Sequence, residues 1–264
     1  MSARRLSGLT RARVMTSGAI AIGNAMLAFL VSIVLARLLG VDAFGDFSLA
    51  WVILMLGSTV LQAGIPRLVT RETARSASND DWGAIALIWR WSVRVSLAIS
   101  LTAVAIVALG VWLLSDRLSP GFSAILLIGM AMLPLMVLGG IATAALQGLN
   151  FVILGQVPGR ILRSAGIVVL AGASLLLEVQ VTAAGAMGLA AAATLASSLV
   201  AAVWLWRRVP EAARGVKPEG SAKPEWLRSM VLLAASVGLL QLNSYIDILI
   251  IGAFRPNSDV GIYR

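Results

Sequence analysis

The sequence has no cysteine, no histidine and few charges, with only 12% of its 264 residues charged. Without cysteine there is no disulfide framework and no thiolate metal site, and without histidine the commonest metal ligand and general base is missing. A soluble domain carries about 25% charged residues, whereas this chain is 59% apolar with a mean hydropathy of +0.93. We therefore expect a membrane protein rather than an enzyme, with no catalytic residue, no metal site and no cofactor.

Long uncharged runs predict membrane-spanning helices, because a helix needs about 20 apolar residues to cross the hydrocarbon. Six runs are long enough, and the last of them contains one acid, Asp247: residues 14–36, 47–66, 95–114, 122–146, 181–206 and 230–254. A seventh run, residues 164–177, is short, and it can span only if Arg160, Ile161 and Arg163 belong to the same helix. The pattern predicts an all-α polytopic membrane bundle of about seven transmembrane helices.

The basic residues predict the orientation of these helices. If the N-terminus is cytoplasmic and the loops alternate, most of the 21 basic residues fall on the cytoplasmic side, as the positive-inside rule requires. The exceptions are Arg37, Arg117, Arg255 and Arg264. This bias explains the net charge of +9 without a nucleic-acid partner. We expect a multi-pass protein of the cytoplasmic (inner) membrane with its N-terminus in the cytoplasm.

The one long polar stretch divides the chain. Residues 1–206 are predicted to form a six-helix lobe, residues 207–228 a cytoplasmic linker, and residues 229–264 the first helix of a second lobe. The junctions after the first and seventh spans are similar, since each has a polar turn followed by an apolar residue, a glycine (Gly45 or Gly261) and an aromatic two residues later. Multi-helix repeats are typical of secondary transporters, so we expect a chain truncated one helix into its second half. Chance similarity of two helix–turn junctions is the alternative.

Three segments carry a family resemblance. The run Leu-Ala-Arg-Leu-Leu-Gly-Val-Asp-Ala-Phe-Gly-Asp-Phe at residues 35–47 resembles the first-loop signature of the polysaccharide exporter family, the Wzx-type oligosaccharide flippases of the MATE-like MOP superfamily. Residues 63–67 resemble the end of that family's second helix, and residues 245–263 resemble the start of its second half. The resemblance implies two six-helix lobes, and so an N-terminal fragment here. The paired arginines that lipid II flippases have in their first helix are missing.

The resemblance implies a substrate with a diphosphate and a glycan, and two arginine pairs are candidates to bind the diphosphate. Arg90 and Arg94 are spaced i, i+4, and Arg160 and Arg163 are spaced i, i+3, so each pair is expected on one helix face. Both pairs are expected at the cytoplasmic ends of spans. Arginine matches phosphate oxygens in bidentate geometry. The alternative is that these side chains are interfacial anchors.

Polar residues inside the spans are candidates for the glycan and for ion coupling. Asn24, Gln62 and Asn243 are predicted to line a central cavity, with interhelical hydrogen bonding as the alternative. Asp247 is the only acid deep in a span, and it follows Asn243 by four residues on the same helix face. An intramembrane carboxylate is a functional candidate, so Asp247 is predicted to bind a coupling cation or a sugar hydroxyl. The alternative is a structural ion pair or a hydrogen bond to a neighbouring helix.

The function these features favour is the flipping of an undecaprenyl-diphosphate-linked oligosaccharide across the membrane for cell-surface polysaccharide synthesis. The expected partners are the lipid-linked oligosaccharide, membrane lipids, a polysaccharide polymerase and glycosyltransferases, with no nucleic acid. A MATE-type antiporter of small cations is the alternative within transport. A membrane-embedded transferase would need an acid–base or metal constellation, which the sequence lacks, and a membrane scaffold remains open.

Overall fold

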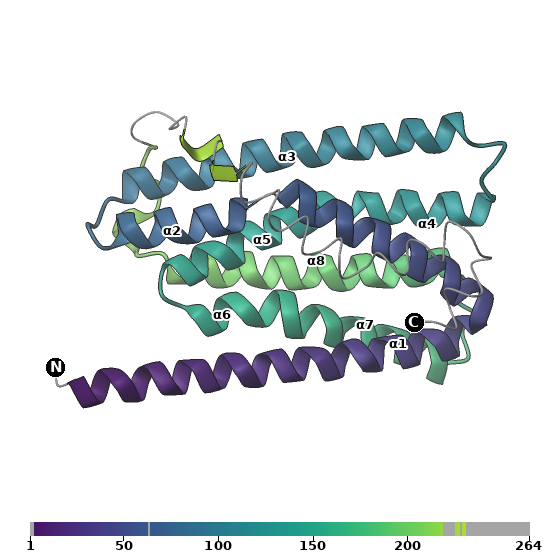
Figure 1. Ribbon diagram of the computed structural model, residues 1–264, viewed down its shortest axis with the longest axis horizontal. Helices are drawn as coiled ribbons and strands as arrows, with labels where there is room; N and C mark the ends of the chain where they lie inside the picture. Colours follow the sequence, from purple (N-terminus) through teal and green to yellow (C-terminus); the bar gives the residue numbers. More distant parts are fainter. Residues whose placement is uncertain (1–2, 63, 219–224, 228, 231–264) are drawn as a thin grey trace.

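The computed structural model describes residues 3–62, 64–218, 225–227 and 229–230. Asn243, Asp247 and the predicted seventh span lie outside the described residues. Over the described residues the chain is an all-α helical bundle whose long helices run side by side (Figure 1). The elements are α1 (Ala3–Gln62), α2 (Ile65–Ala77), α3 (Trp82–Leu113), α4 (Pro120–Ala131), α5 (Leu133–Gly148), α6 (Val152–Val157), η1 (Pro158–Leu162), α7 (Arg163–Leu176), α8 (Ala183–Arg208) and η2 (Glu211–Ala213).

Helix α1 contains the first two predicted spans. Its apolar part, Met15–Ser58, has 44 residues, about 66 Å at 1.5 Å per residue, which is twice the thickness of the hydrocarbon. Gly40 interrupts it with φ 74° and ψ 173°, a backbone conformation that favours glycine. Figure 1 shows α1 turning back at the end opposite the N-terminus. The predicted polar turn over residues 40–47 is therefore reduced to a break at one glycine.

Four further helical segments are long and apolar enough to cross a membrane: Trp82–Leu113, Pro120–Gly148, Val152–Leu176 and Ala183–Arg208. The second of these bends at Met132, two residues before Pro134, where α4 ends and α5 begins. The third includes α6, η1 and α7, so the prediction that Arg160 and Arg163 belong to the short fifth span is confirmed. With the two halves of α1, the described part of the chain has six potential spans. It is a multi-pass membrane protein.

The basic segment after the second span is a helix, not the predicted loop. Gly64, with φ 74°, is the N-cap of α2, and Pro66 lies in the first turn of that helix. The buried residues of α2 recur every three or four positions and form one face against α3 and α5: Ile65, Leu68, Val69, Glu72 and Thr73. This period is that of an amphipathic helix, and it places Arg67 and Arg71 on the exposed side.

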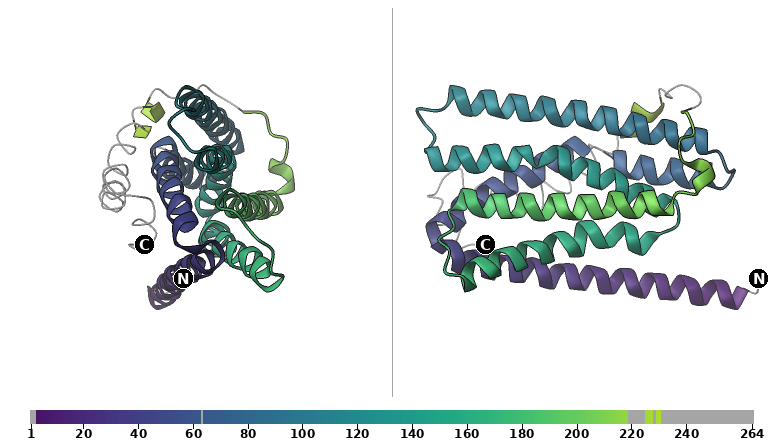
Figure 2. Two further views of the ribbon diagram at one scale, coloured as in Figure 1. Left: turned by 90° about the vertical axis from the view of Figure 1, so that its right-hand side faces the viewer. Right: turned by 180° about the vertical axis from the view of Figure 1, so that it is seen from behind.

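Two apolar clusters hold the bundle together. The larger one joins both halves of α1 to α4, α7 and α8, with Leu35, Phe44 and Met187 among its buried side chains. The other joins α2 and α5, with α3 packed against it. Figure 2 shows these helices end-on, with the first half of α1 at the edge of the bundle. Small residues allow α5 and α8 to approach closely, since a Cβ at Gly139 would overlap Ser198.

The segment after α8 returns to the α2–α3 hairpin. Trp226 is 4% exposed and packs with Leu68 and Ile88. Its ring lies edge-on to that of Trp91, with the ring centroids 5.4 Å apart. A buried aromatic pair of this kind contributes about 0.5–1.5 kcal/mol beyond its buried area. Residues 225–227 are thus attached to α2 and α3.

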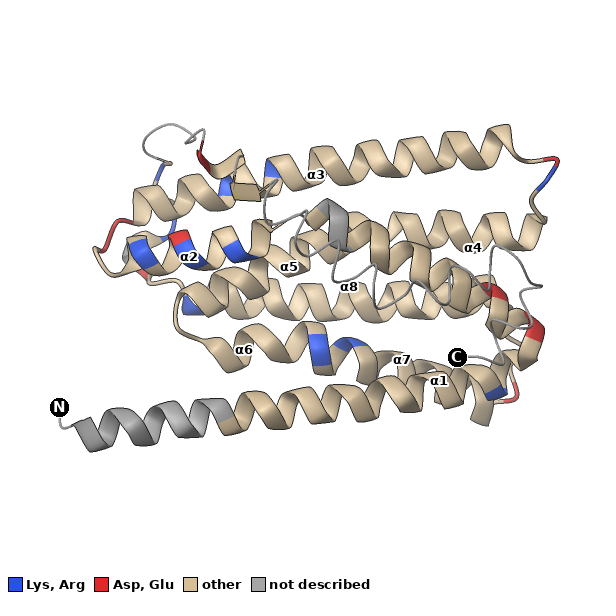
Figure 3. Cartoon of the chain, in the orientation of Figure 1, with Lys and Arg blue, Asp and Glu red and all other residues tan. Residues whose placement is uncertain are grey.

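Positive charge gathers at one end of the bundle, which we call the basic end. There α1 begins, α2 meets α3, α5 meets α6, and α8 ends (Figure 3). The basic residues of these junctions include Arg71, Arg75, Arg207 and Arg208. This separation agrees with the charge bias seen in the sequence. That the basic end faces the cytoplasm stays a prediction.

Candidate functional site

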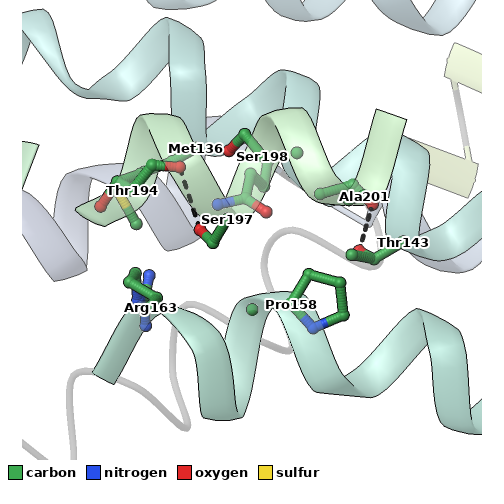
Figure 4. A pocket seen from close by; sticks show the side chains of 12 residues that line it. Met136, Thr143, Pro158, Arg163, Thr194, Ser197, Ser198 and Ala201 are labelled. Carbon is green, nitrogen blue, oxygen red and sulfur yellow. Dashed lines mark hydrogen bonds between the residues drawn. The ribbon is translucent and has the colours of Figure 1, made fainter. Parts of the chain in front are cut away.

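A polar pocket lies inside the bundle where α1 ends. Its volume is about 150 Å³, and its lining comes from Gln62 of α1, from α5, from η1 with Arg163, and from α8. In Figure 4, Arg163 and Pro158 lie on one side, facing Thr194, Ser197 and Ser198 of α8 across the pocket. We call it the inner pocket.

A larger pocket continues from the inner one toward the basic end. Its volume is about 410 Å³, and the two pockets share Gln62, Gly140 and Thr143. It adds two arginines of α2, Arg67 and Arg71, and the polar side chains Thr70 and Gln147. We call the two pockets together the polar groove. Within the described part of the chain, its lining holds three arginines and no acidic residue.

The position of Arg163 along its span follows from the helix that carries it. It is eleven residues from Val152, where the span begins, about 17 Å at 1.5 Å per residue. Arg163 therefore lies near the middle of this 25-residue helical segment. The prediction that Arg160 and Arg163 sit at the end of a span is therefore wrong. The sequence suggested it because the uncharged run begins only at Ser164, but the helix already starts at Val152.

The π-helical turn η1 separates the two arginines. The Arg163 backbone N–H donates to the Pro158 carbonyl, five residues back, which is a wider turn than an α-helix makes. Arg163 lines the inner pocket and is half-buried, whereas Arg160 is exposed and is not part of the lining. The i, i+3 spacing would place both on one face only in a regular α-helix.

Close packing shapes this turn. A Cβ at Gly155 would lie 2.5 Å from Gln147 Cγ and 2.6 Å from the Thr143 carbonyl oxygen. The Gln147 side-chain amide donates to the Gly155 carbonyl at 3.2 Å. Gly155 thus lets α6 approach α5, and the glutamine fixes the contact. Together they set where η1 and Arg163 lie beside the groove.

The hydroxyl groups of the groove donate to backbone carbonyls. Thr194 donates to Ala190 at 2.8 Å and Ser197 to Thr194 at 2.9 Å. Ser198 donates to Leu135 at 3.1 Å, and Thr143 to Gly140 at 2.9 Å. A hydroxyl that donates its proton keeps two acceptor lone pairs. The groove therefore presents oxygen acceptors beside the guanidinium and amide donors, which suits a ligand that has both anionic oxygens and hydroxyls.

From the sequence alone, Arg67 and Arg71 indicated only the orientation of the chain in the membrane, although both line the groove. Arg71 forms a salt bridge with Glu72 at 3.1 Å, and its side chain is 60% exposed, so it remains accessible to a ligand. A signal was present: the apolar residues of 65–73 follow a helical period, which puts both arginines on the opposite face.

The other predicted site residues lie elsewhere. Arg90 and Arg94 are exposed on α3, which contributes no residue to the lining of the groove. Asn24 is half-buried on α1 and is also not in that lining, whereas Gln62 joins the two pockets. Their proposed roles in substrate binding stay predictions. Among the residues that the structure describes, no cluster of three acidic side chains could hold a metal ion.

Comparisons with known proteins fit this architecture. A family model described as polysaccharide biosynthesis protein matches residues 12–264. No protein of curated function matches the chain. An inward-facing multidrug-resistance MATE-family transporter of the MOP superfamily is similar in structure, with a TM-score of 0.62 at 19% identity, covering 90% of this chain and 56% of that one.

Two further solved structures are similar. A MOP-superfamily transporter from Pyrococcus furiosus, whose binding pocket is described as of reversed polarity, gives a TM-score of 0.65 at 16% identity, covering 89% of this chain and 52% of that one. A MATE protein in complex with Br-NRF gives 0.61 at 19% identity, with 89% and 54% covered. At these identities the likeness shows the fold, and the chain spans about half the length of each of these structures.

Proposed function

Because the chain belongs to the polysaccharide biosynthesis protein family, matched over residues 12–264, and has the fold of MOP-superfamily transporters, we propose that it is a membrane transporter. Its substrate is a lipid-linked oligosaccharide carried on undecaprenyl diphosphate, which it flips across the cytoplasmic membrane for cell-surface polysaccharide synthesis. The polar groove with Arg163 near the middle of its helical segment is the observation that supports this most directly. In this proposal the chain transports without a chemical step.

The physical requirement is to move two phosphates and a glycan past the hydrocarbon. An isolated ion in an apolar medium costs tens of kcal/mol by idealised solvation estimates, so the path must supply partners for the charge. Arg71, Arg67 and Arg163 follow one another from the basic end to the interior of the groove. Guanidinium groups bind phosphate oxygens in bidentate fashion. The serine and threonine hydroxyls and Gln62 supply partners for sugar hydroxyls.

Antiport of small cations is the second candidate, since two of the similar structures are MATE proteins. Such a substrate would favour acidic and aromatic side chains in the groove. Among the residues that the structure describes, the lining contains neither an acid nor an aromatic residue. Three arginines would repel a cation, with an energy of several kcal/mol at close range in a partly buried site. The electrostatics of the groove therefore favour an anionic substrate.

A flipping assay in proteoliposomes tests the proposal. The purified chain is reconstituted with an undecaprenyl-diphosphate-linked disaccharide that carries a fluorophore, and an impermeant reductant quenches the outer leaflet. We expect quenching to extend to the inner-leaflet pool with the chain and to stop at the outer-leaflet pool without it. Quenching that is the same with and without the chain would contradict the proposal.

A further inference from the structure

A second pocket at the basic end is lined mainly by apolar and aromatic side chains. Its volume is about 380 Å³, and it lies between the first turns of α3 and the last turns of α8, with Trp82, Trp89 and Trp206 in its lining. It shares no lining residue with the polar groove. The transport path described above does not use it.

The segment that follows α8 covers this pocket and places one arginine in its lining. After Val209 the chain forms the short helix η2, and Gly215, with φ 84°, then turns the backbone. Figure 2 shows this segment passing from α8 toward α3. The Arg214 guanidinium lies 4.6 Å from the centre of the Trp206 ring. Its Nη2 donates to the Trp206 carbonyl oxygen at 3.3 Å.

The charge of Arg214 is only weakly compensated. Its side chain is 32% exposed, and its carboxylate partner, Glu211, is 3.7 Å away with 92% of its side chain exposed. Exposed ion pairs of this kind contribute about 0–1 kcal/mol. A guanidinium has five N–H donors, and the hydrogen bond from Arg214 to the Trp206 carbonyl oxygen uses one of them. The remaining donors can bind an anion in the pocket.

The position of the pocket along the helices matches the headgroup layer of a membrane. Helix α3 has 32 residues, about 48 Å at 1.5 Å per residue, and so extends beyond the roughly 30 Å of hydrocarbon. Tryptophan is enriched at this level. Arg214 is a basic residue of its lining, and none of the described residues that line it is acidic. Basic pockets between helices at this depth bind anionic headgroups.

From these observations we infer that the pocket binds an anionic phospholipid of the surrounding leaflet. The phosphate pairs with Arg214, and the glycerol and first acyl carbons lie among Trp82, Trp89 and Trp206. A zwitterionic phospholipid has the same phosphate, but its ammonium group would lie beside the Arg214 guanidinium, which disfavours it. This site does not involve the transported substrate, so the lipid-binding proposal can be tested separately from the proposed function.

Native mass spectrometry of the purified chain in mixed micelles tests the site, with phosphatidylglycerol and phosphatidylethanolamine as the probes. We expect phosphatidylglycerol to bind more tightly. Arg214→Gln is expected to weaken that binding about tenfold, as the loss of one charge-assisted hydrogen bond would. The matched control is Arg207→Gln, which removes the same charge from an exposed residue outside the lining, and binding should be unchanged.

A second variant tests the pocket without changing any charge. Ala202 lines the pocket and is exposed, so Ala202→Phe adds a ring where the lipid would lie and should reduce phosphatidylglycerol binding even if Arg214→Gln does not fold. Equal binding of the two phospholipids would overturn the proposal. So would equal losses in Arg214→Gln and Arg207→Gln, which would indicate diffuse attraction to the basic end, or undiminished binding in Ala202→Phe.

Discussion

Arg160 and Arg163 are three positions apart, yet only one of them meets the groove. Arg163 is half-buried in the inner pocket, while Arg160 is exposed outside it. Both carry the same charge on the same span, so they form a matched pair. A general effect of positive charge on insertion or expression should appear at both positions. A role in substrate binding should appear at Arg163.

The first prediction uses this pair. Arg163→Gln should lower the initial rate of lipid-linked oligosaccharide flipping at least about tenfold, since a hydrogen bond to a charged group contributes roughly 1.5–3 kcal/mol and 1.4 kcal/mol is tenfold. Arg160→Gln should retain most of the rate. The measurement is the quenching assay at equal reconstituted protein. Equal losses in the two variants would refute the specific role of Arg163.

The second prediction concerns the contact of α5 with α2. A Cβ at Gly148 would lie 2.6 Å from Thr73 Cβ and 2.9 Å from the Thr70 carbonyl oxygen. Gly148→Ala should therefore destabilise the protein by about 1–3 kcal/mol, as overpacking does. Gly172→Ala, where nothing lies within 4 Å, should be neutral or stabilising by up to about 1 kcal/mol. Thermal unfolding in detergent compares them, and a lower melting temperature for the second variant would contradict the account.

At the scale of elements, the attachment of residues 225–227 rests largely on one side chain. Trp226 is buried against α2 and α3, whereas its neighbour Leu227 is 51% exposed. Loss of a buried aromatic side chain costs about 3–5 kcal/mol. That cost should appear as local detachment of the segment rather than as unfolding of the bundle, because the larger apolar cluster does not include Trp226.

The third prediction follows from this attachment. Trp226→Ala should speed tryptic cleavage after Arg214, which is exposed in the preceding segment, because proteolysis tracks local opening. Leu227→Ala should leave the cleavage rate close to that of the unchanged chain. Timed proteolysis followed by mass spectrometry measures both. Identical rates in all three proteins would show that Trp226 does not hold the segment.

Helix α2 and the turn η1 show what the sequence could and could not reveal. The buried positions of α2 follow the period of an amphipathic helix. This helix could therefore have been predicted from the sequence, but its arginines suggested a loop. The π-helical turn η1 could not be predicted from the sequence, because we attribute it to the close packing of Gly155 against α5, which is a tertiary contact. Most spans were predictable to within a few residues. The two exceptions are α3 and the fifth span, whose first turns contain the charged pairs Arg90 and Arg94, and Arg160 and Arg163. Tertiary contacts decide such local geometry.

The whole molecule has two ends of different charge, and the fourth prediction concerns which side each end faces. The sequence lacks cysteine, so single cysteines can be introduced without removing any. Three exposed positions lie at junctions of the basic end: Ser78 between α2 and α3, Asn150 between α5 and α6, and Lys217 after α8. Cysteines there should react with an impermeant maleimide only after the cells are opened. Cysteines at Ser115 and Glu178 should react in intact cells. The reverse pattern would invert the proposed orientation.

The two functional proposals also differ at this scale. The polar groove and the aromatic pocket share no residue, so variants of one should leave the other intact. Of the predicted site residues within the described chain, Gln62 and Arg163 line the groove. Arg67 and Arg71 also line the groove, but this could be seen only in the structure, because the lining combines residues that are distant in the sequence.

The sign of charge that the groove accepts is the most direct test of the account. Equilibrium binding to the chain in nanodiscs would be measured for an undecaprenyl-diphosphate-linked disaccharide and for a cationic dye such as ethidium. The account predicts that the glycolipid binds, that Arg163→Gln weakens its binding about tenfold, and that the dye does not compete. Binding of the dye with no binding of the glycolipid would contradict it.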